Sequence, residues 1–254
     1  MAQNRWSHNE MVLALALYFQ IPFGRINRNT PEVKKLGELI GRGANAASMR
    51  LANFAHIDPY IINSGRNGLA GGEKACRPIW DEYAEDKERL FKEAAEIKAS
   101  LLNQTIEESL QIQPNDFVGH ERETVIKQRV DQSAFRAMIL NNYNETCAIT
   151  GINDKRLLAA CHIIPWSKRK DTRLNPENGI CLSPLYHEAF DQGLFTIRPD
   201  DYTVMISPSL QERLTKNVYL DHFGKFENRK IILPEEHLPD VAFLLHHAEN
   251  TFIA

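Results

Sequence analysis

The chain has 254 residues and a formal net charge of −3, with 43% hydrophobic and 25% charged residues. These values are typical of an ordinary globular protein, and the length suffices for one large or two small domains that each bury a core. The slight acidic excess argues against a protein that wraps nucleic acid with its whole surface, but it is compatible with a local basic groove.

No targeting or membrane-spanning segment is expected. The apolar stretch at residues 13–19 is too short to cross a bilayer, and the N-terminus lacks the charged, apolar and cleavage segments of a signal peptide. The four cysteines form no C-x-x-C pair, which argues against a zinc knuckle or a disulfide framework. We therefore expect a protein of the reducing cytoplasm.

Three helices are predicted near the N-terminus. Residues 6–20 carry apolar positions at helical spacing, and the pattern stops before Pro22. A second helix begins at Thr30, and the glycines of residues 41–43 separate it from a third helix over about residues 44–56. A helix, a turn that contains glycine and a further helix form the outline of a helix-turn-helix unit.

Polar side chains on the outward face of the third helix predict a contact with DNA. They are Arg42 at its start, followed by Asn45, Ser48 and Arg50. Side chains of these types bind phosphates and base edges. The same pattern also fits a three-helix bundle that only packs against the rest of the chain, and these residues alone do not separate the two interpretations.

The middle of the chain is predicted to connect two domains. Residues 57–79 are rich in turn dipeptides and indicate a solvated loop. Over residues 80–104 charged side chains alternate with apolar ones at helical spacing, which predicts an exposed connecting helix. Residues 105–122 form the predicted linker.

A further helix is predicted over residues 123–143, with apolar positions at helical spacing and several basic side chains. A guanidinium matches two phosphate oxygens at once, so Arg129 and Arg136 are candidate phosphate ligands. A structural salt bridge is an equally good interpretation of Arg136.

The segment that follows indicates a hairpin. Ile163 and Ile164 predict a strand that Pro165 ends. The pair Asn178-Gly179 is a strong turn signal, and residues 180–182 predict a short returning strand.

A helix that begins at Pro184 carries His187 and Asp191 four residues apart, so that their side chains share one face. With His162 and Asn178, one hairpin and one helix would bring an imidazole, an amide and a His/Asp pair into one cleft. These groups suit metal-assisted hydrolysis, which needs a general base, an orienting group and oxygen or nitrogen ligands for a divalent ion.

After this core, the alternating pattern of residues 193–207 predicts a second β-hairpin, and the chain closes with a helix near residues 241–252. His246 and His247 are consecutive, so on a helix they point in different directions. We interpret them as surface or packing residues.

The order and spacing of His162, Asn178 and His187 resemble the motif of the HNH (ββα-metal) nucleases, which takes its name from these residue types. Longer strings resemble the branch found in bacterial restriction-type endonucleases: CAITG from Cys147, HIIPW from His162, NGI from Asn178 and HEAFDQG from His187. The resemblance is strongest over residues 125–210. Similarity to the N-terminal module of such proteins lies at Trp6 and in residues 14–19, 40–42 and 49–54.

The resemblance implies a role for each polar residue of the core. His162 would be the general base, because a neutral imidazole with an ordinary pKa of about 6.5 can take a proton from water near neutral pH. His187 and Asp191 would hold the metal ion, and Asn178 would fix the loop and the orientation of His162 by hydrogen bonding. The competing interpretations are a packed strand histidine, a surface carboxylate and a turn asparagine.

One position departs from the family's pattern. Many members have Asp, Glu or His directly before the base histidine as another ligand, and here that residue is Cys161. Adjacent strand residues point to opposite faces, so Cys161 and His162 would not both face the cleft without a twist or bulge. A ligating Cys161 would favour a softer ion such as zinc, but we expect a small buried residue.

We therefore predict an α+β protein: a helix-turn-helix-like DNA-recognition domain at residues 1–79, a connecting helix and linker at 80–122, and a ββα-metal nuclease domain at 123–254 with its core at 145–207. By resemblance it would be a DNA endonuclease in restriction or phage defence, acting on double-stranded DNA as a homodimer, with no nucleotide cofactor. One Mg²⁺ or Mn²⁺ ion per chain is expected, with Zn²⁺ or Ni²⁺ as alternatives. The competing functions are a DNA-binding regulator with a degenerate nuclease fold, which Cys161 supports, and a phosphodiesterase acting on RNA or a small nucleotide.

Overall fold

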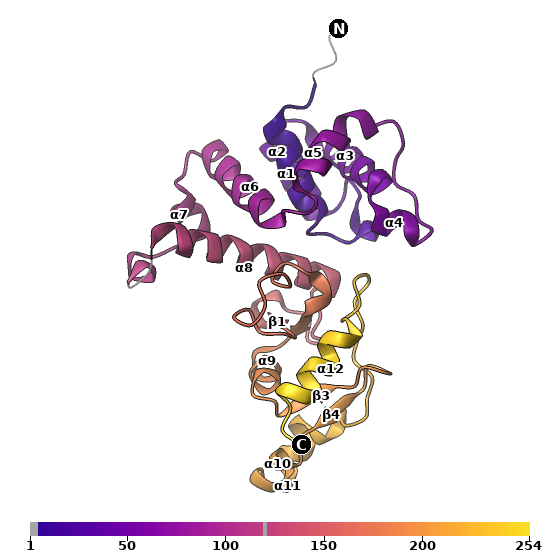
Figure 1. Ribbon diagram of the computed structural model, residues 1–254, viewed down its shortest axis with the longest axis vertical. Helices are drawn as coiled ribbons and strands as arrows, with labels where there is room; N and C mark the ends of the chain where they lie inside the picture. The colour runs from indigo at the N-terminus through magenta and orange to yellow at the C-terminus, as the bar shows by residue number, and fades with distance from the viewer. Residues whose placement is uncertain (1–4, 119–120) are drawn as a thin grey trace. The chain divides into compact units, whose positions relative to one another are not determined.

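The computed structural model describes residues 5–118 and 121–254. The chain groups into two compact units, Met1–Ala134 and Phe135–Ala254 (Figure 1). The helix α8 (Arg122–Asn142) begins in the first unit and ends in the second. None of the helices in the described part of the chain is both long and apolar enough to cross a membrane.

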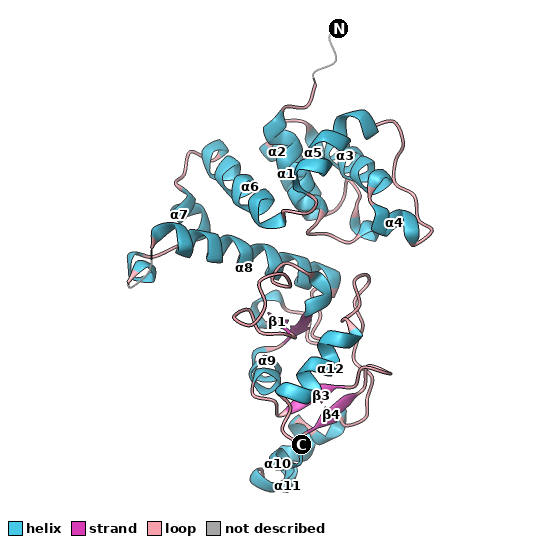
Figure 2. Cartoon of the chain, viewed as in Figure 1, coloured by secondary structure: helices cyan, strands magenta, loops and turns pink. Residues whose placement is uncertain are grey.

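The rest of the first unit is helical (Figure 2). Its elements are α1 (His8–Tyr18), η1 (Phe23–Arg25), α2 (Pro31–Leu39), α3 (Gly43–Ile57), α4 (Pro59–Asn63), α5 (Glu73–Tyr83), α6 (Lys87–Leu101), α7 (Ile106–Leu110) and η2 (Pro114–Phe117). At the start of α1, Ser7 and Glu10 form a reciprocal capping box. Residues 11–16 of α1 are all buried, because the helix packs against α2, α3, α5 and α6.

The α2–α3 pair has the predicted order of helix, glycine turn and helix. Gly41 and Gly43 take left-handed φ angles of 67° and 75°, which favour glycine. A Cβ on Gly37 would lie 2.4 Å from the carbonyl carbon of Gly43, so a glycine at this position lets the two segments approach closely. The order of elements is that of a helix-turn-helix unit, but a three-helix bundle can share it.

The middle of the chain differs from the prediction. Residues 57–79, expected as loop, contain α4 and the first part of α5. The single helix expected over residues 80–104 is two helices, because Asp86 caps a new one by accepting a hydrogen bond from the Arg89 amide at 3.1 Å. The charge periodicity continues across this break, so the pattern did not reveal it.

The predicted linker at residues 105–122 is also more ordered than expected. Thr105 and Glu108 form a capping box that begins α7, and η2 follows. Residues 119 and 120 of this segment lie outside the described residues.

The second unit contains two separate antiparallel hairpins in its described residues. After α8 come η3 (Lys155–Leu157), β1 (Ala159–His162), η4 (Pro176–Asn178), β2 (Gly179–Leu182), α9 (Pro184–Asp191), β3 (Phe195–Ile197), β4 (Val204–Ile206), α10 (Pro208–Arg213), α11 (Lys216–His222), η5 (Gly224–Phe226) and α12 (Val241–Asn250). The β1–β2 hairpin followed by α9 has the predicted order, and so does the β3–β4 hairpin.

The first strand ends earlier than predicted. β1 stops at His162, and Ile163 and Ile164 lie just beyond it, both buried. The reason is Asn178: its backbone carbonyl accepts from the Ile163 amide at 2.9 Å, and its side-chain Oδ1 accepts from the Ile164 amide at 2.8 Å. The side-chain amide of Asn178 thus takes the hydrogen bond from Ile164 that a backbone carbonyl of the partner strand would otherwise accept.

Gly179 lies opposite His162 in the strand register. A Cβ on Gly179 would meet Ile139 Cδ1 at 2.2 Å and Phe135 Cζ at 2.8 Å, both on α8. The missing side chain therefore allows α8 to pack directly on the hairpin at the level of His162.

Candidate metal centre

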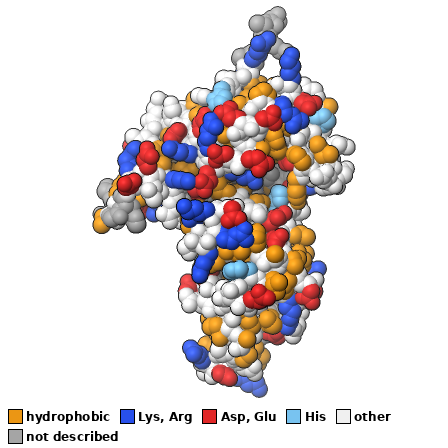
Figure 3. Space-filling view, in the orientation of Figure 1, with side chains coloured by type: hydrophobic (Ala, Val, Ile, Leu, Met, Phe, Trp, Pro, Cys, Tyr) orange, Lys and Arg blue, Asp and Glu red, His pale blue; other side chains and the backbone are white. Residues whose placement is uncertain are grey.

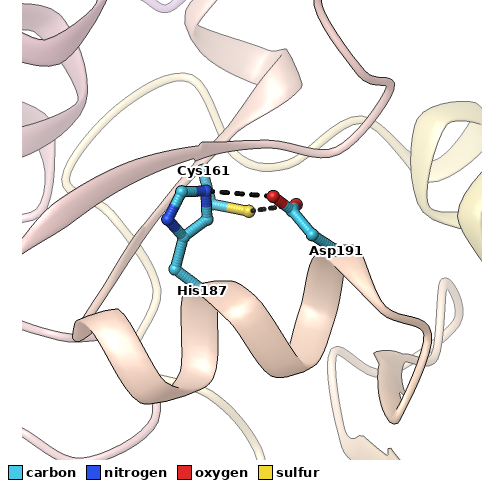
Figure 4. A group of neighbouring side chains, drawn as sticks. All are labelled: Cys161, His187 and Asp191. Atoms are coloured by element: carbon cyan, nitrogen blue, oxygen red, sulfur yellow. Dashed lines mark hydrogen bonds and ion pairs between the residues drawn. The ribbon is translucent and has the colours of Figure 1, made fainter.

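The helix α9 places His187 and Asp191 on one face, as the four-residue spacing predicts. The imidazole Nε2 of His187 lies 3.3 Å from Oδ2 of Asp191, and both side chains are partly open to solvent (Figure 4). The helix starts at Pro184, whose missing amide hydrogen does no harm there. Ser183 occupies the N-cap position, but its side chain does not cap the helix, and its amide donates to Cys147 Sγ instead.

Cys161 projects from β1 toward this pair. Its side chain is fully buried, and its Sγ lies 3.5 Å from Oδ1 of Asp191. One ligand atom from each of Cys161, His187 and Asp191 lies within 4.8 Å of the other two, as Figure 4 shows. Cys161 is thus both a small buried residue, as we expected, and a neighbour of the predicted ligands.

The three side chains fit a divalent metal ion. Bonds of about 2.0–2.3 Å to sulfur, nitrogen and oxygen place two ligands of one tetrahedral ion roughly 3.3–3.8 Å apart. The separations of Asp191 from His187 and from Cys161, 3.3 Å and 3.5 Å, already lie in that range. A set of one thiol, one imidazole and one carboxylate matches the preferences of a borderline ion such as zinc better than those of magnesium.

The electrostatics of the cluster favour a cation. Burial, reinforced by the negative charge of Asp191, raises the pKa of the Cys161 thiol well above its usual value. The hydrogen bond to Asp191 is the main cause that raises the pKa of His187, against the opposing effect of burial. A metal ion bound here would displace protons from the ligands that coordinate it.

His162 is held on the other side of β1. Its ring stacks on Phe135 with centroids 3.6 Å apart and planes at 10°, and Trp166 meets it edge-on at 5.6 Å. Its Nε2 lies 3.1 Å from the backbone carbonyl of Arg173. Because a carbonyl only accepts, Nε2 carries the proton and Nδ1 keeps a free lone pair.

The surroundings of His162 keep its imidazole neutral. Burial is the largest cause that lowers its pKa below the ordinary value, while the Arg173 carbonyl and Asp191 act in the opposite direction and His187 lowers it further. The charges of Asp191 and His187 therefore reach His162, although the strand alternation sends Cys161 and His162 to different neighbours.

Asn178 is completely buried and closes the loop between the two strands. Besides accepting from the Ile164 amide, its Nδ2 donates to the carbonyls of Ile164 at 3.1 Å and Thr172 at 3.3 Å. These contacts are the loop-fixing hydrogen bonds that the sequence suggested for this residue.

The predicted DNA-contacting residues of α3 differ in their surroundings. The guanidinium of Arg42 binds Glu10 at 2.6 Å and 2.9 Å, and those of Arg42 and Arg50 lie 5.0 Å and 4.8 Å from the Trp6 ring centroid. Arg50 also donates to Cys76 Sγ at 3.6 Å. Asn45 is exposed and Ser48 half-buried.

The two predicted phosphate ligands of α8 also have partners within the chain. Arg129 pairs with Asp116 at 3.1 Å, and Arg136 donates to the backbone carbonyl of Lys155 at 3.2 Å. Arg129 belongs to the first unit and Arg136 to the second.

Sequence reasoning missed two features of the site. The Arg173 carbonyl that fixes the tautomer of His162 is a backbone group and leaves no trace in the sequence. A contact between Phe135 and the site could have been expected, because Phe135 lies on the helix that precedes the core. The stacking on His162, however, needs the space that Gly179 leaves, since a Cβ there would lie 2.8 Å from Phe135 Cζ.

A hairpin followed by a helix, with metal-ligand side chains on both, defines the class of ββα-metal sites. Residues 147–198 match the profile of a family described as HNH endonuclease. The matched segment holds Cys161, His162, Asn178, His187 and Asp191, so it supports an HNH nuclease domain in the second unit. No curated protein matches the chain.

Proposed function

We propose that this protein is a metal-dependent endonuclease that hydrolyses phosphodiester bonds in double-stranded DNA. One observation carries the proposal: Cys161, His187 and Asp191 gather their ligand atoms within 4.8 Å of one another, and the charges of His187 and Asp191 reach the imidazole of His162, whose Nδ1 is unprotonated. The match of this segment to HNH endonucleases supports it.

His162 is the proposed general base. Its Nε2–H donates to the Arg173 carbonyl, so Nδ1 is the atom that accepts a proton from the attacking water. The stacked ring of Phe135 and the edge of Trp166 hold the imidazole in one orientation. Its lowered pKa keeps the base unprotonated at neutral pH.

Cys161, His187 and Asp191 are the proposed metal ligands. A divalent ion held there would polarise a phosphate oxygen and stabilise the charge that develops on the leaving oxygen. We include Cys161 because its thiol faces the carboxylate of Asp191. With a thiolate ligand, Zn²⁺ or Co²⁺ would be preferred over Mg²⁺ and Mn²⁺.

The first unit is proposed to position the DNA. Asn45 is exposed and Ser48 partly so, and both lie on α3, the second helix of the glycine-linked pair. Because Arg42 and Arg50 already pack on Trp6, their proposed role is to hold the start of α3 as well as to contact DNA. A restriction or phage-defence role and a homodimer follow from the resemblance to restriction-type proteins.

A second function, DNA binding without cleavage, is favoured by a single observation. The position directly before the proposed base, where many HNH nucleases have Asp, Glu or His as a further ligand, is the buried Cys161. A chain that bound DNA but failed to cleave it with every divalent ion tested would have this function.

The test is cleavage of supercoiled plasmid in the presence of Mg²⁺, Mn²⁺, Co²⁺ or Zn²⁺. We expect nicking or linearisation by the wild type and at least a 100-fold loss in His162→Ala. Added imidazole should partly restore the activity of that variant, and His222→Ala, an exposed histidine of the same unit, should behave as the wild type. Equal cleavage by the wild type and His162→Ala would remove His162 from the mechanism.

A further inference from the structure

We infer that residues 165–175, which form the middle of the connection between β1 and β2, bind the phosphodiester backbone of the DNA duplex. We call this segment the basic loop. The inference rests on the proposed nuclease function and names a DNA-binding surface that the sequence did not single out.

The basic loop concentrates positive charge in a chain that is acidic as a whole. It contains the basic residues Lys168, Arg169, Lys170 and Arg173, against one acidic residue within that stretch, Asp171, while the whole chain has a net charge of −3. Figure 3 shows several Lys and Arg side chains on the visible face of the molecule, with Asp and Glu side chains among them. Such a local excess attracts a polyanion despite the overall charge.

Two lysines of the basic loop are available for a ligand. Lys168 and Lys170 are exposed, and within the described residues neither side chain has a hydrogen-bond or ion-pair partner. By contrast, Arg169 pairs with Asp171, and Arg173 donates to the Trp166 carbonyl at 3.0 Å. The two lysines can therefore take up phosphate contacts without breaking an interaction within the chain.

The arginines named earlier as candidate DNA ligands are in a different situation. Arg42, Arg50, Arg129 and Arg136 each have a partner inside the chain. A phosphate would have to compete with these partners. Lys168 and Lys170 face no such competition, which is why we assign the backbone contact to the loop.

The basic loop is also held in shape. Asn178 donates to the Thr172 carbonyl at 3.3 Å, and the Thr172 hydroxyl donates to the Arg169 carbonyl at 3.4 Å. The Arg173 guanidinium lies 4.6 Å from the ring centroid of Trp166. Little conformational entropy of the loop is therefore lost on binding, beyond that of the lysine side chains.

The loop is joined to the proposed base. The Arg173 carbonyl accepts the hydrogen bond from His162 Nε2, and the ring of Trp166 lies at 79° to the same imidazole with centroids 5.6 Å apart. A DNA strand bound along the loop would thus lie next to His162. Lys168 and Lys170 are both exposed and lie two residues apart, so each can meet a separate phosphate of an extended backbone, which fits them better than a free phosphate ion.

The experiment compares Lys168→Ala/Lys170→Ala with Lys216→Ala/Lys225→Ala, which removes the same charge from exposed lysines of the same unit. Fluorescence anisotropy with a labelled DNA duplex in EDTA measures binding without cleavage. We expect the loop variant to bind roughly tenfold or more weakly at about 0.1 M salt, and its plot of log affinity against log salt to lose about 1.8 in slope, since each phosphate contact contributes about 0.9. The control should bind as the wild type.

Equal losses of DNA affinity in the two variants would show that only net charge matters and would overturn the inference. Wild-type affinity in the loop variant, or no DNA binding by the wild type, would overturn it as well. Plasmid cleavage separates this inference from the proposed function. If the loop variant binds DNA more weakly than the wild type, but the wild type never cleaves plasmid, the DNA-binding role of the loop stands and the nuclease function is rejected. If both hold, the loop variant should show a raised KM with little change in kcat.

Discussion

The thiol of Cys161 and the carboxylate of Asp191 face each other between β1 and α9, with Sγ and Oδ1 3.5 Å apart. One residue comes from the strand and the other from the last position of the helix. A metal ion that bound both would therefore join the hairpin to the helix.

The first prediction concerns the sulfur ligand. Co²⁺ added to the wild type should give a sulfur-to-metal charge-transfer absorption in the near ultraviolet, and Cys161→Ser should lack it. Loss of supporting hydrogen bonds around a metal commonly weakens binding by about 10–100-fold, so loss of a direct ligand should weaken it by at least that much. Cys76→Ser, in the first unit, is the control and should keep the absorption. The same band in both variants would exclude Cys161 as a ligand.

The second prediction concerns acid stability. His247 is buried on α12: its Nε2–H donates to the Phe190 carbonyl at 3.0 Å, the Thr196 hydroxyl donates to Nδ1 at 2.9 Å, and its ring stacks on Phe190. Burial is the main cause that lowers the pKa of His247 to about 4. In the unfolded chain the value is about 6.5, so between these pH values the unfolded state binds more protons.

The free energy of unfolding of the second unit should therefore fall as the pH drops from about 6.5 towards 4, by roughly 3 kcal/mol at most. His247→Gln removes this titration, so the variant should be less stable at neutral pH but lose less on acidification. Hydrogen exchange of the amides in β3 and α12 at several pH values measures the difference. If the free energy of unfolding depends on pH in the same way in the wild type and in His247→Gln, His247 does not take up a proton on unfolding in this pH range.

The third prediction tests the loop closure by Asn178. Asn178→Ala leaves the Ile164 amide and the carbonyls of Ile164 and Thr172 without this partner, which should destabilise the second unit by roughly 2–4 kcal/mol. Because the same loop presents the Arg173 carbonyl to His162, kcat should fall more than the loss of folded protein explains. Asn175→Ala is the control: it removes one local bond, to the Glu177 amide. Thermal melting and single-turnover cleavage give the two readouts, and equal effects in both variants would contradict the role of Asn178.

The parts of the site that the sequence predicted are those fixed by local geometry. The four-residue spacing of His187 and Asp191 needs only a helix to place both side chains on one face. The pair Asn178-Gly179, which predicted a turn, instead ends η4 and begins β2, and Gly179 has the extended angles φ −136° and ψ 145°. The shared face of α9 follows from neighbours in the chain, and the structure places both side chains there.

The parts that the sequence did not predict depend on contacts between distant residues. The strand ends at His162 because the side chain of Asn178, sixteen residues on, takes the place of the strand partner. Arg42 appeared to be an outward-facing basic residue, but Glu10 binds it across the helical unit. Neither pairing has a local signal in the sequence.

The fourth prediction separates a structural role of Arg42 from DNA binding. Its ion pair with Glu10 is bidentate, and the two side chains are only 15% and 19% exposed. We expect Arg42→Ala to lower the stability of the first unit by roughly 1–3 kcal/mol, more than loss of an exposed pair would. A double-mutant cycle with Glu10→Gln, followed by urea unfolding, measures the coupling of the two side chains. If stability is unchanged while DNA affinity falls, Arg42 contacts DNA and does not support the fold.

The fifth prediction connects the packing of α8 with the proposed base. In Gly179→Ala the new Cβ would lie 2.2 Å from Ile139 Cδ1 and 2.8 Å from Phe135 Cζ, so the ring under His162 must shift. We expect a loss of about 1–3 kcal/mol in stability and a lower kcat. Ile139→Val removes the closest atom, so Gly179→Ala/Ile139→Val should regain part of the stability. Because the contact with Phe135 remains, kcat should recover less. Full recovery of kcat in the double variant would show that the position of the Phe135 ring does not matter for His162.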